Sequence, residues 1–181
     1  MKVTPKKISG MVTIEPTIFR DERGFFLEAF QAKRYEQCGV NLNFVQINHS
    51  KSIQNTIRGL HSQFKFPQGK LVRVLKGEIF DVGVDARRTS PTYGQWDFEI
   101  LSSETFKQLY IPPGCFHGFA VLSPEAEVEY LTSDFYVPDD EIGIIWNDTK
   151  LSINWPVQAP ILSKKDKNFY SWEIIRDKLS F

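Results

Sequence analysis

The segment from Arg58 to Lys70 contains the residues best suited to acid–base chemistry. Its sequence, RGLHSQFKFPQGK, places a single histidine, His61, among cations inside an apolar stretch. Strand residues separated by an even number share a face, so we expect His61 and Gln63 on one face, with Lys70 joining them from the next strand. A histidine titrates near neutral pH, and nearby cations favour its neutral, proton-accepting form. The segment therefore indicates a general base, with a hydrogen-bonded core histidine as the alternative.

Many short strands are needed to position these residues. Aromatic residues make up 14% of the 181-residue chain, and turn signals such as Pro112-Pro113-Gly114 separate the apolar runs. This pattern predicts an all-β sandwich or barrel, with one domain spanning residues 1–181. We expect strands at Met11–Ile18, Phe25–Phe30, Asn43–Ser50, Thr56–Phe64, Lys70–Lys76, Glu78–Asp85, Gln95–Leu101, Phe106–Ile111, Phe116–Leu122, Ala126–Thr132 and Ile142–Trp146, and helices only at Ala32–Gln37 and Ser171–Leu179.

Composition excludes several classes of partner. The 22 basic and 22 acidic side chains give a formal net charge of zero, so bulk charge offers no attraction to nucleic acid or to an acidic membrane surface. No stretch approaches the roughly 18 apolar residues of a membrane span, and no apolar region of a secretory signal follows the N-terminal lysines. Cys38 and Cys115 form no disulfide framework. We expect a soluble, cytoplasmic protein that binds neither nucleic acid nor membrane.

Metal chemistry is a competing expectation. Jelly-roll barrels often bind a metal through an HxH motif with a later glutamate and histidine. This chain has three histidines, His49, His61 and His117, and no two are close in sequence. They can still converge in the fold, but the paired ligands of an imidazole-rich site are missing. We therefore expect metal-free acid–base chemistry, with no metal and no cofactor.

A set of ordered motifs carries a family resemblance. In chain order they are FRDERGFFLEAF (19–30), QINHS (46–50), RGLHSQ (58–63), KLVRVLKGEIFDVGVDAR (70–87), SPTYGQW (90–96), IPPGCFHGFAVLS (111–123), AEVEYLTSDFY (126–136), WND (146–148) and WP…ILSKKD (155–166). Together they cover nearly the whole chain and resemble the dTDP-4-dehydrorhamnose 3,5-epimerase family. The resemblance implies a cupin-type jelly roll, a homodimer and no metal. It also implies conversion of dTDP-4-dehydro-6-deoxy-D-glucose to dTDP-4-dehydro-L-rhamnose in dTDP-L-rhamnose biosynthesis.

The same resemblance implies roles for individual residues. His61 corresponds to the catalytic base and Asp166 to the carboxylate that orients it, while Tyr130 corresponds to the acid across the sugar. Lys70 and His117 correspond to residues around the 4-keto oxygen and the sugar. Phe19, Arg23, Glu28, Gln46, Asn48 and Arg58 correspond to nucleotide- and diphosphate-binding residues, and Tyr136 to a second tyrosine that packs near the sugar. Two residues depart from the family pattern: Ser62, where phenylalanine is common, and Cys115.

The chemistry of epimerisation fits these residue types independently. Inverting a sugar carbon requires that a proton leave one face and another arrive on the opposite face. Beside a ketone the intermediate is an enolate, so the site needs a base, an acid across the ring and a cation at the enolate oxygen. A histidine held by a carboxylate, a tyrosine and a lysine meet these needs. As alternatives, Tyr130 is a core aromatic and Asp166 a turn residue.

Three functions are compatible with this sequence. The leading one is a 3,5-epimerase acting on a nucleotide-linked 4-keto-6-deoxyhexose. The second is a related isomerase, either an epimerase at one carbon or a 3,4-ketoisomerase. The third is a non-catalytic barrel that binds a sugar nucleotide. The presence of both His61 and Tyr130 favours epimerisation, because pure binding gives no reason to combine a base with an acid.

Overall fold

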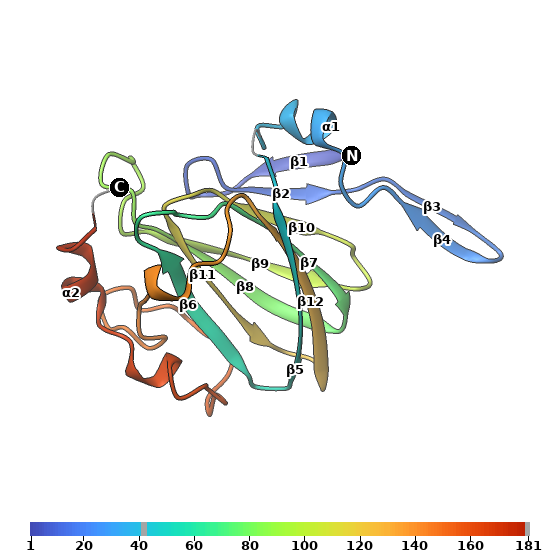
Figure 1. The fold of residues 1–181 in the computed structure, drawn as a ribbon. Coiled ribbons are helices and arrows are strands. Elements are labelled where there is room, and N and C mark those ends of the chain that lie inside the picture. The colour runs from blue at the N-terminus through green and yellow to red at the C-terminus, as the bar shows by residue number, and fades with distance from the viewer. Residues whose placement is uncertain (41–42, 180–181) are drawn as a thin grey trace.

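Two antiparallel sheets face each other in the computed structural model, which describes residues 1–40 and 43–179 (Figure 1). The first sheet has the order β1 (Lys2–Pro5), β2 (Val12–Glu15), β10 (Gln108–Ile111), β7 (Lys70–Lys76), β12 (Glu125–Thr132) and β5 (Gln46–Ile53). The second has the order β13 (Glu141–Gly143), β6 (Ile57–Gln63), β11 (Cys115–Val121), β8 (Glu78–Asp85) and β9 (Trp96–Ser102). The prediction of an all-β fold is confirmed.

Smaller elements surround the two sheets. Within the described part of the chain, the strands β3 (Ile18–Asp21) and β4 (Gly24–Leu27) pair only with each other, and Figure 1 shows this ribbon extending away from the body. The helical elements are α1 (Ala32–Glu36), η1 (Pro138–Asp140), η2 (Asp166–Asn168) and α2 (Trp172–Arg176). Among the helices of the described residues, none is long and apolar enough to cross a membrane.

The strand β8 shows how sequence pattern becomes two packed layers. Its alternate residues Phe80, Val82 and Val84 pack in one cluster with the C-terminal segment that contains α2. Ile79 belongs to a second cluster, which lies between the two sheets. Because successive strand residues point to opposite faces, Asp81 lies on the same inner face as Ile79. Alternation alone does not say which face is the inner one, and the hydrogen bond of Asp81 to His117 places this carboxylate inside.

Several predicted boundaries were wrong. The expected strand Met11–Ile18 ends at Glu15 as β2, because Pro16 has no backbone N–H to continue a ladder, and a separate strand β3 begins at Ile18. The expected strand Asn43–Ser50 begins later and runs to Ile53, while β1 was not expected. The tail helix covers only Trp172–Arg176. The ends of elements depend on partners elsewhere in the chain, which local pattern does not reveal.

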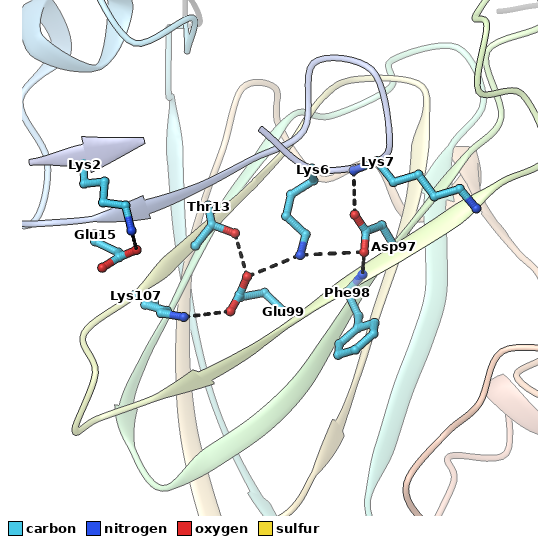
Figure 2. A network of polar contacts seen from close by, with 9 residues as sticks. All are labelled: Lys2, Lys6, Lys7, Thr13, Glu15, Asp97, Phe98, Glu99 and Lys107. Carbon is cyan, nitrogen blue, oxygen red and sulfur yellow. Dashed lines mark hydrogen bonds and ion pairs between the residues drawn. The ribbon is translucent and has the colours of Figure 1, made fainter. Parts of the chain in front are cut away.

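A charged network ties the edge strand β9 to the opposite sheet (Figure 2). The Glu99 carboxylate accepts hydrogen bonds from Thr13 Oγ1 on β2 at 2.8 Å, from Lys107 Nζ at 3.0 Å and from Lys6 Nζ at 3.3 Å. Burial opposes ionisation of Glu99, but the hydrogen bonds and the lysine charges outweigh it and lower the pKa of this carboxyl. The network therefore joins the two sheets at β9, which is the edge strand of the five-stranded sheet.

Candidate active site

A pocket of about 310 Å³ opens between the two sheets, and side chains from both sheets line it. Most of the predicted site residues meet there: Gln46, Asn48, Arg58, His61, Lys70, His117, Tyr130 and Tyr136. Asp166 joins them through a hydrogen bond to His61. The convergence of these residues from separate strands makes this pocket the candidate active site.

Three neighbouring strands of the six-stranded sheet supply one wall of the pocket. Tyr130 of β12 lies directly opposite Asn48 of β5, and Thr132 lies opposite both Gln46 of β5 and Lys70 of β7. Residues directly opposite each other in antiparallel strands project to the same face. The tyrosine, the lysine and the two amides therefore share the inner face because of strand register.

A bulge in β6 brings Arg58 and His61 to the same pocket. In the pairing with β11, His61 lies opposite His117 and Arg58 opposite Phe119, so Gly59 and Leu60 together oppose Gly118. The extra residue shifts the alternation of β6, because a regular strand would send Arg58 and His61 to opposite faces. Gly118 allows this close approach, since a Cβ there would lie 2.7 Å from the Arg58 carbonyl oxygen.

His61 is oriented by a buried carboxylate. Its Nε2 lies 2.7 Å from Oδ1 of Asp166, whose side chain is 4% exposed. The backbone N–H of Asp166 donates to Ser163 Oγ at 3.0 Å, and the ring of Phe169 packs edge-on against the imidazole. Burial opposes ionisation of Asp166, but the hydrogen bond and charge of His61 outweigh it, so the pKa of this carboxyl is lowered. An ionised Asp166 accepts the hydrogen on Nε2 and leaves Nδ1 free to take a proton.

A second histidine–carboxylate pair lies beside the first. His117 Nε2 is 2.6 Å from Asp81 Oδ1, and both side chains are buried. Burial lowers the pKa of His117, although Asp81 opposes this effect. The ring centroid of His117 lies 6.2 Å from that of Tyr130 in an edge-on arrangement. His117 therefore links the wall that carries His61 to the wall that carries Tyr130.

Lys70 and Tyr130 have the protonation states that acid–base chemistry requires. Burial lowers the pKa of Lys70 to about 8, against the opposing effects of Glu141 and Asp81, so the amine still carries its proton at neutral pH. Among the described residues, no side chain forms an ion pair with the Lys70 ammonium. Burial also raises the pKa of Tyr130, so its phenol keeps its hydrogen. The pocket therefore contains a cation and a proton donor near His61.

The pocket rim contains residues that the sequence did not single out. Glu141 accepts a hydrogen bond from the Tyr136 hydroxyl at 2.6 Å and from Lys165 Nζ at 2.7 Å, and it lies 3.8 Å from His61 Nε2. Burial opposes ionisation of Glu141, but the hydrogen bonds from Lys165 and Tyr136 outweigh it and lower its pKa. Gln63 and Gln68 also line the pocket. Of these residues, the sequence indicated only Gln63, through its even spacing from His61.

Three predicted binding residues lie outside the pocket of this chain. Phe19 and Arg23 belong to the β3–β4 ribbon and its turn, and Glu28 directly follows it. The Phe19 side chain is 61% exposed. Arg23 forms an ion pair with Asp21 at 2.6 Å, and Glu28 forms one with Arg34 at 3.1 Å. Within a single chain, therefore, these residues do not reach the other site residues.

The described residues include no group of three or more His, Cys, Asp or Glu side chains placed to hold a metal. Gln63 stands two residues after His61, where an HxH motif would place its second imidazole. Its amide hydrogen-bonds to the backbone at Phe66, Phe135 and Val137. The side chain at the second HxH position is therefore an amide whose nitrogen and oxygen both hydrogen-bond to the backbone.

The fold and the pocket define a cupin-type barrel with acid–base side chains in its interior. A family model described as dTDP-4-dehydrorhamnose 3,5-epimerase matches residues 5–173. The chain belongs to this family, and its activity is that of an isomerase, the dTDP-4-dehydrorhamnose 3,5-epimerase of dTDP-L-rhamnose biosynthesis. The resemblance seen in the sequence motifs is confirmed.

Individual relatives place the chain among epimerases of dTDP-linked sugars, and they include a 3-epimerase. The dTDP-4-dehydrorhamnose 3,5-epimerase of Pseudomonas aeruginosa is 51% identical over 92% of this chain and 93% of its own length. The crystal structure of a dTDP-6-deoxy-D-glucose-3,5-epimerase from Legionella pneumophila with dTDP-4-keto-L-rhamnose superposes with a TM-score of 0.94 at 46% identity, covering 98% of this chain and 95% of that one. A dTDP-4-dehydrorhamnose 3-epimerase of Streptomyces niveus is 38% identical over 93% of this chain and 82% of its own length. The predicted cupin-type jelly roll is confirmed by the structural match.

Proposed function

We propose that the pocket inverts carbons 3 and 5 of dTDP-4-dehydro-6-deoxy-D-glucose, with His61 as the base and Tyr130 as the acid. The observation that carries this proposal is the position of the two residues on opposing sheets around one pocket, with Asp166 holding His61. A ligand bound between the sheets has one residue on each side. Inversion requires this arrangement, because the new proton must approach the carbon from the face opposite to the one from which the first proton left.

Each residue then has a defined step. The free Nδ1 of His61 takes the proton from carbon 3, and the electron pair moves to the 4-keto oxygen to form an enolate. The Lys70 ammonium stabilises that oxygen, because a cation in a water-poor pocket lowers the energy of developing negative charge. The Tyr130 hydroxyl then gives its proton to carbon 3 from the other side. His61 and Tyr130 exchange protons with water, and the same sequence at carbon 5 completes the reaction.

Isotope exchange tests the assignment of substrate and reaction. The purified protein is incubated with dTDP-4-dehydro-6-deoxyglucose in deuterated water, and deuterium and configuration are measured at each carbon by NMR. We expect deuterium and inversion at both carbons 3 and 5. Deuterium at one carbon only would instead indicate a single-carbon epimerase, a 3-keto product would indicate a ketoisomerase, and no exchange would indicate a binding protein.

We also propose that the enzyme is a homodimer in which the β3–β4 ribbon of each chain reaches the pocket of the other. The ribbon exposes Phe19, Phe25 and Phe26, which are 61%, 55% and 68% accessible in the single chain. Adjacent exposed aromatic residues are typical of an interface that a partner covers. A second copy would bring Phe19, Arg23 and Glu28 to a pocket, as their predicted binding role requires.

Two measurements test the dimer. Light scattering should give twice the chain mass, and Phe26→Asp should shift the protein toward monomer. Ile174→Asp is the matched control, because Ile174 is an equally apolar residue, 47% exposed, on α2. Mixed dimers of an Arg23→Ala chain and a His61→Ala chain should regain activity through one intact pocket. If Arg23 served the pocket of its own chain, both pockets of the mixed dimer would stay defective.

We further propose that residues 1–181 act as one domain and that the enzyme works in the cytoplasm. Cys38 and Cys115 are free thiols, which suits a reducing compartment. Fractionation of the native host with an antibody against this chain tests the location. A major pool outside the cytoplasmic fraction would contradict it.

A further inference from the structure

The residues from Ser133 to Val137 connect β12 to η1 and carry Tyr136 to the rim of the pocket; we name them the Tyr136 segment. We infer that Gln63 is a positioning residue, which fixes this segment by hydrogen bonds and thereby holds Tyr136 in place for substrate binding. The inference rests on the proposed function, because it assumes that the pocket binds the nucleotide sugar.

Gln63 hydrogen-bonds to the backbone on both sides of Tyr136. Its Nε2 donates to the carbonyl oxygen of Phe135 at 3.1 Å and to that of Phe66 at 2.8 Å. Its Oε1 accepts from the backbone N–H of Val137 at 2.7 Å. The residue is 2% exposed, so almost no water can replace these bonds. A buried donor or acceptor left without a partner is costly, and the backbone at 135 and 137 is therefore strongly held.

Gln46 completes the attachment from the opposite sheet. Its Oε1 accepts from the Tyr136 backbone N–H at 3.0 Å, and its Nε2 donates to Asn48 at 2.8 Å. Gln46 belongs to β5 and Gln63 to β6, so the segment spans the pocket mouth between the two sheets. The Tyr136 side chain is itself 47% exposed and gains little from packing. The hydroxyl of Tyr136 is held by Glu141 at 2.6 Å, and its backbone is held by the bonds from Gln63 and Gln46.

Gln63 also links this rim to the proposed base. It lies two residues after His61 on the same strand and the same face. Loss of its amide would release the rim without removing the His61–Asp166 hydrogen bond, which involves a different segment. We therefore expect substrate affinity to fall more than the rate of the chemical step.

Kinetics of Gln63→Leu test this inference, beginning from measured wild-type epimerase activity so that a failure of the proposed function is recognised separately. We expect KM for the nucleotide sugar to rise about tenfold, as loss of one well-placed buried interaction predicts, while kcat falls less than about twofold. The matched control is Gln108→Leu. Gln108 is 1% exposed and also uses both ends of its amide, with Ala29 and Tyr35, but outside the pocket. It should lower the melting temperature and leave KM unchanged.

A double-mutant cycle with Tyr136→Ala separates positioning from direct contact. If Gln63 acts through Tyr136, adding Gln63→Leu to Tyr136→Ala should raise KM no further. Fully additive effects would overturn the inference, as would a KM change of equal size in Gln108→Leu or a loss confined to kcat. If Gln63→Leu does not fold, Gln63→Asn serves in its place, because it keeps a polar amide but is too short to reach both backbone groups, and the same outcomes apply.

Discussion

His61 Nε2 and Asp166 Oδ1 lie 2.7 Å apart, although 105 residues separate them in the chain. The contact joins a central strand to the short 3₁₀ helix η2 in the C-terminal segment. An ionised Asp166 accepts the hydrogen on Nε2, so the contact leaves Nδ1 as the nitrogen without hydrogen. The C-terminal segment, which up to residue 179 contributes no sheet strand after β13, therefore determines the chemistry of a strand residue.

Removal of the base should nearly abolish turnover. General base catalysis contributes roughly 10²–10⁴-fold, so His61→Ala should lose at least that factor in kcat. Asp166→Asn should lose less, because an amide can still contact Nε2 but cannot stabilise an imidazolium. Calorimetric titration with dTDP checks that both variants still bind the nucleotide. Near-normal turnover in His61→Ala would disprove the assignment.

Loss of the acid should separate exchange from inversion. Tyr130→Phe removes the hydroxyl that delivers the new proton but leaves His61 able to take one and return a solvent hydrogen to the same face. In deuterated water this variant should incorporate deuterium and form little inverted product, as NMR of the sugar would show. Inversion at the wild-type rate would make Tyr130 only part of the pocket wall. Loss of exchange as complete as in His61→Ala would contradict the division of roles.

The charge of Lys70 should limit activity at alkaline pH. Burial lowers its pKa to about 8, so the cation is present below that pH and is lost as pH rises through it. The rate constant kcat/KM should therefore decline above about pH 8. Lys70→Arg keeps a charge throughout this range and should lose the decline, whatever its absolute activity. A pH–rate profile with an unchanged alkaline limb in that variant would exclude Lys70 as its source.

A methyl group at Gly118 should disturb the bulge that places Arg58 and His61. Its Cβ would lie 2.7 Å from the Arg58 carbonyl oxygen, which belongs to the backbone and moves only if β6 moves. Gly118→Ala should destabilise the fold by about 1–3 kcal/mol, measured by denaturant unfolding, and lower activity. Gly83→Ala is the control, because its Cβ would meet the flexible Met11 side chain at 3.0 Å. Equal losses of stability and activity in the two variants would show that the effect of Gly118→Ala does not come from the bulge.

Stability in acid should depend on Glu99. Its pKa is lowered in the folded state, so its contribution is present above the unfolded pKa of roughly 4.3 and is lost as pH falls through the folded value. Glu99→Gln should lower the melting temperature at neutral pH and show a weaker further fall toward pH 3. Glu104→Gln, at an exposed position of the neighbouring turn, should match wild type at both pH values.

Local pattern was sufficient for the class of fold and for the kinds of chemistry. Alternating apolar residues predicted an all-β protein, and a histidine, a tyrosine, a lysine and a late carboxylate matched the needs of epimerisation. The ordered motifs identified the family. These signals are encoded in residue type and spacing, which do not depend on contacts between distant parts of the chain.

The tertiary structure alone decided which residues meet. The bulge opposite Gly118 turns Arg58 to the side of His61, contrary to simple alternation. The register of β12 sets Tyr130 beside Asn48, and the pairing of β13 with β6 places Glu141 opposite Gln63, where it contacts Tyr136 and Lys165. Such contacts arise from pairing over long sequence separations, where a shift of one residue reverses every face. The sequence by itself therefore determined the chemistry available to this protein, and long-range pairing determined where that chemistry is assembled.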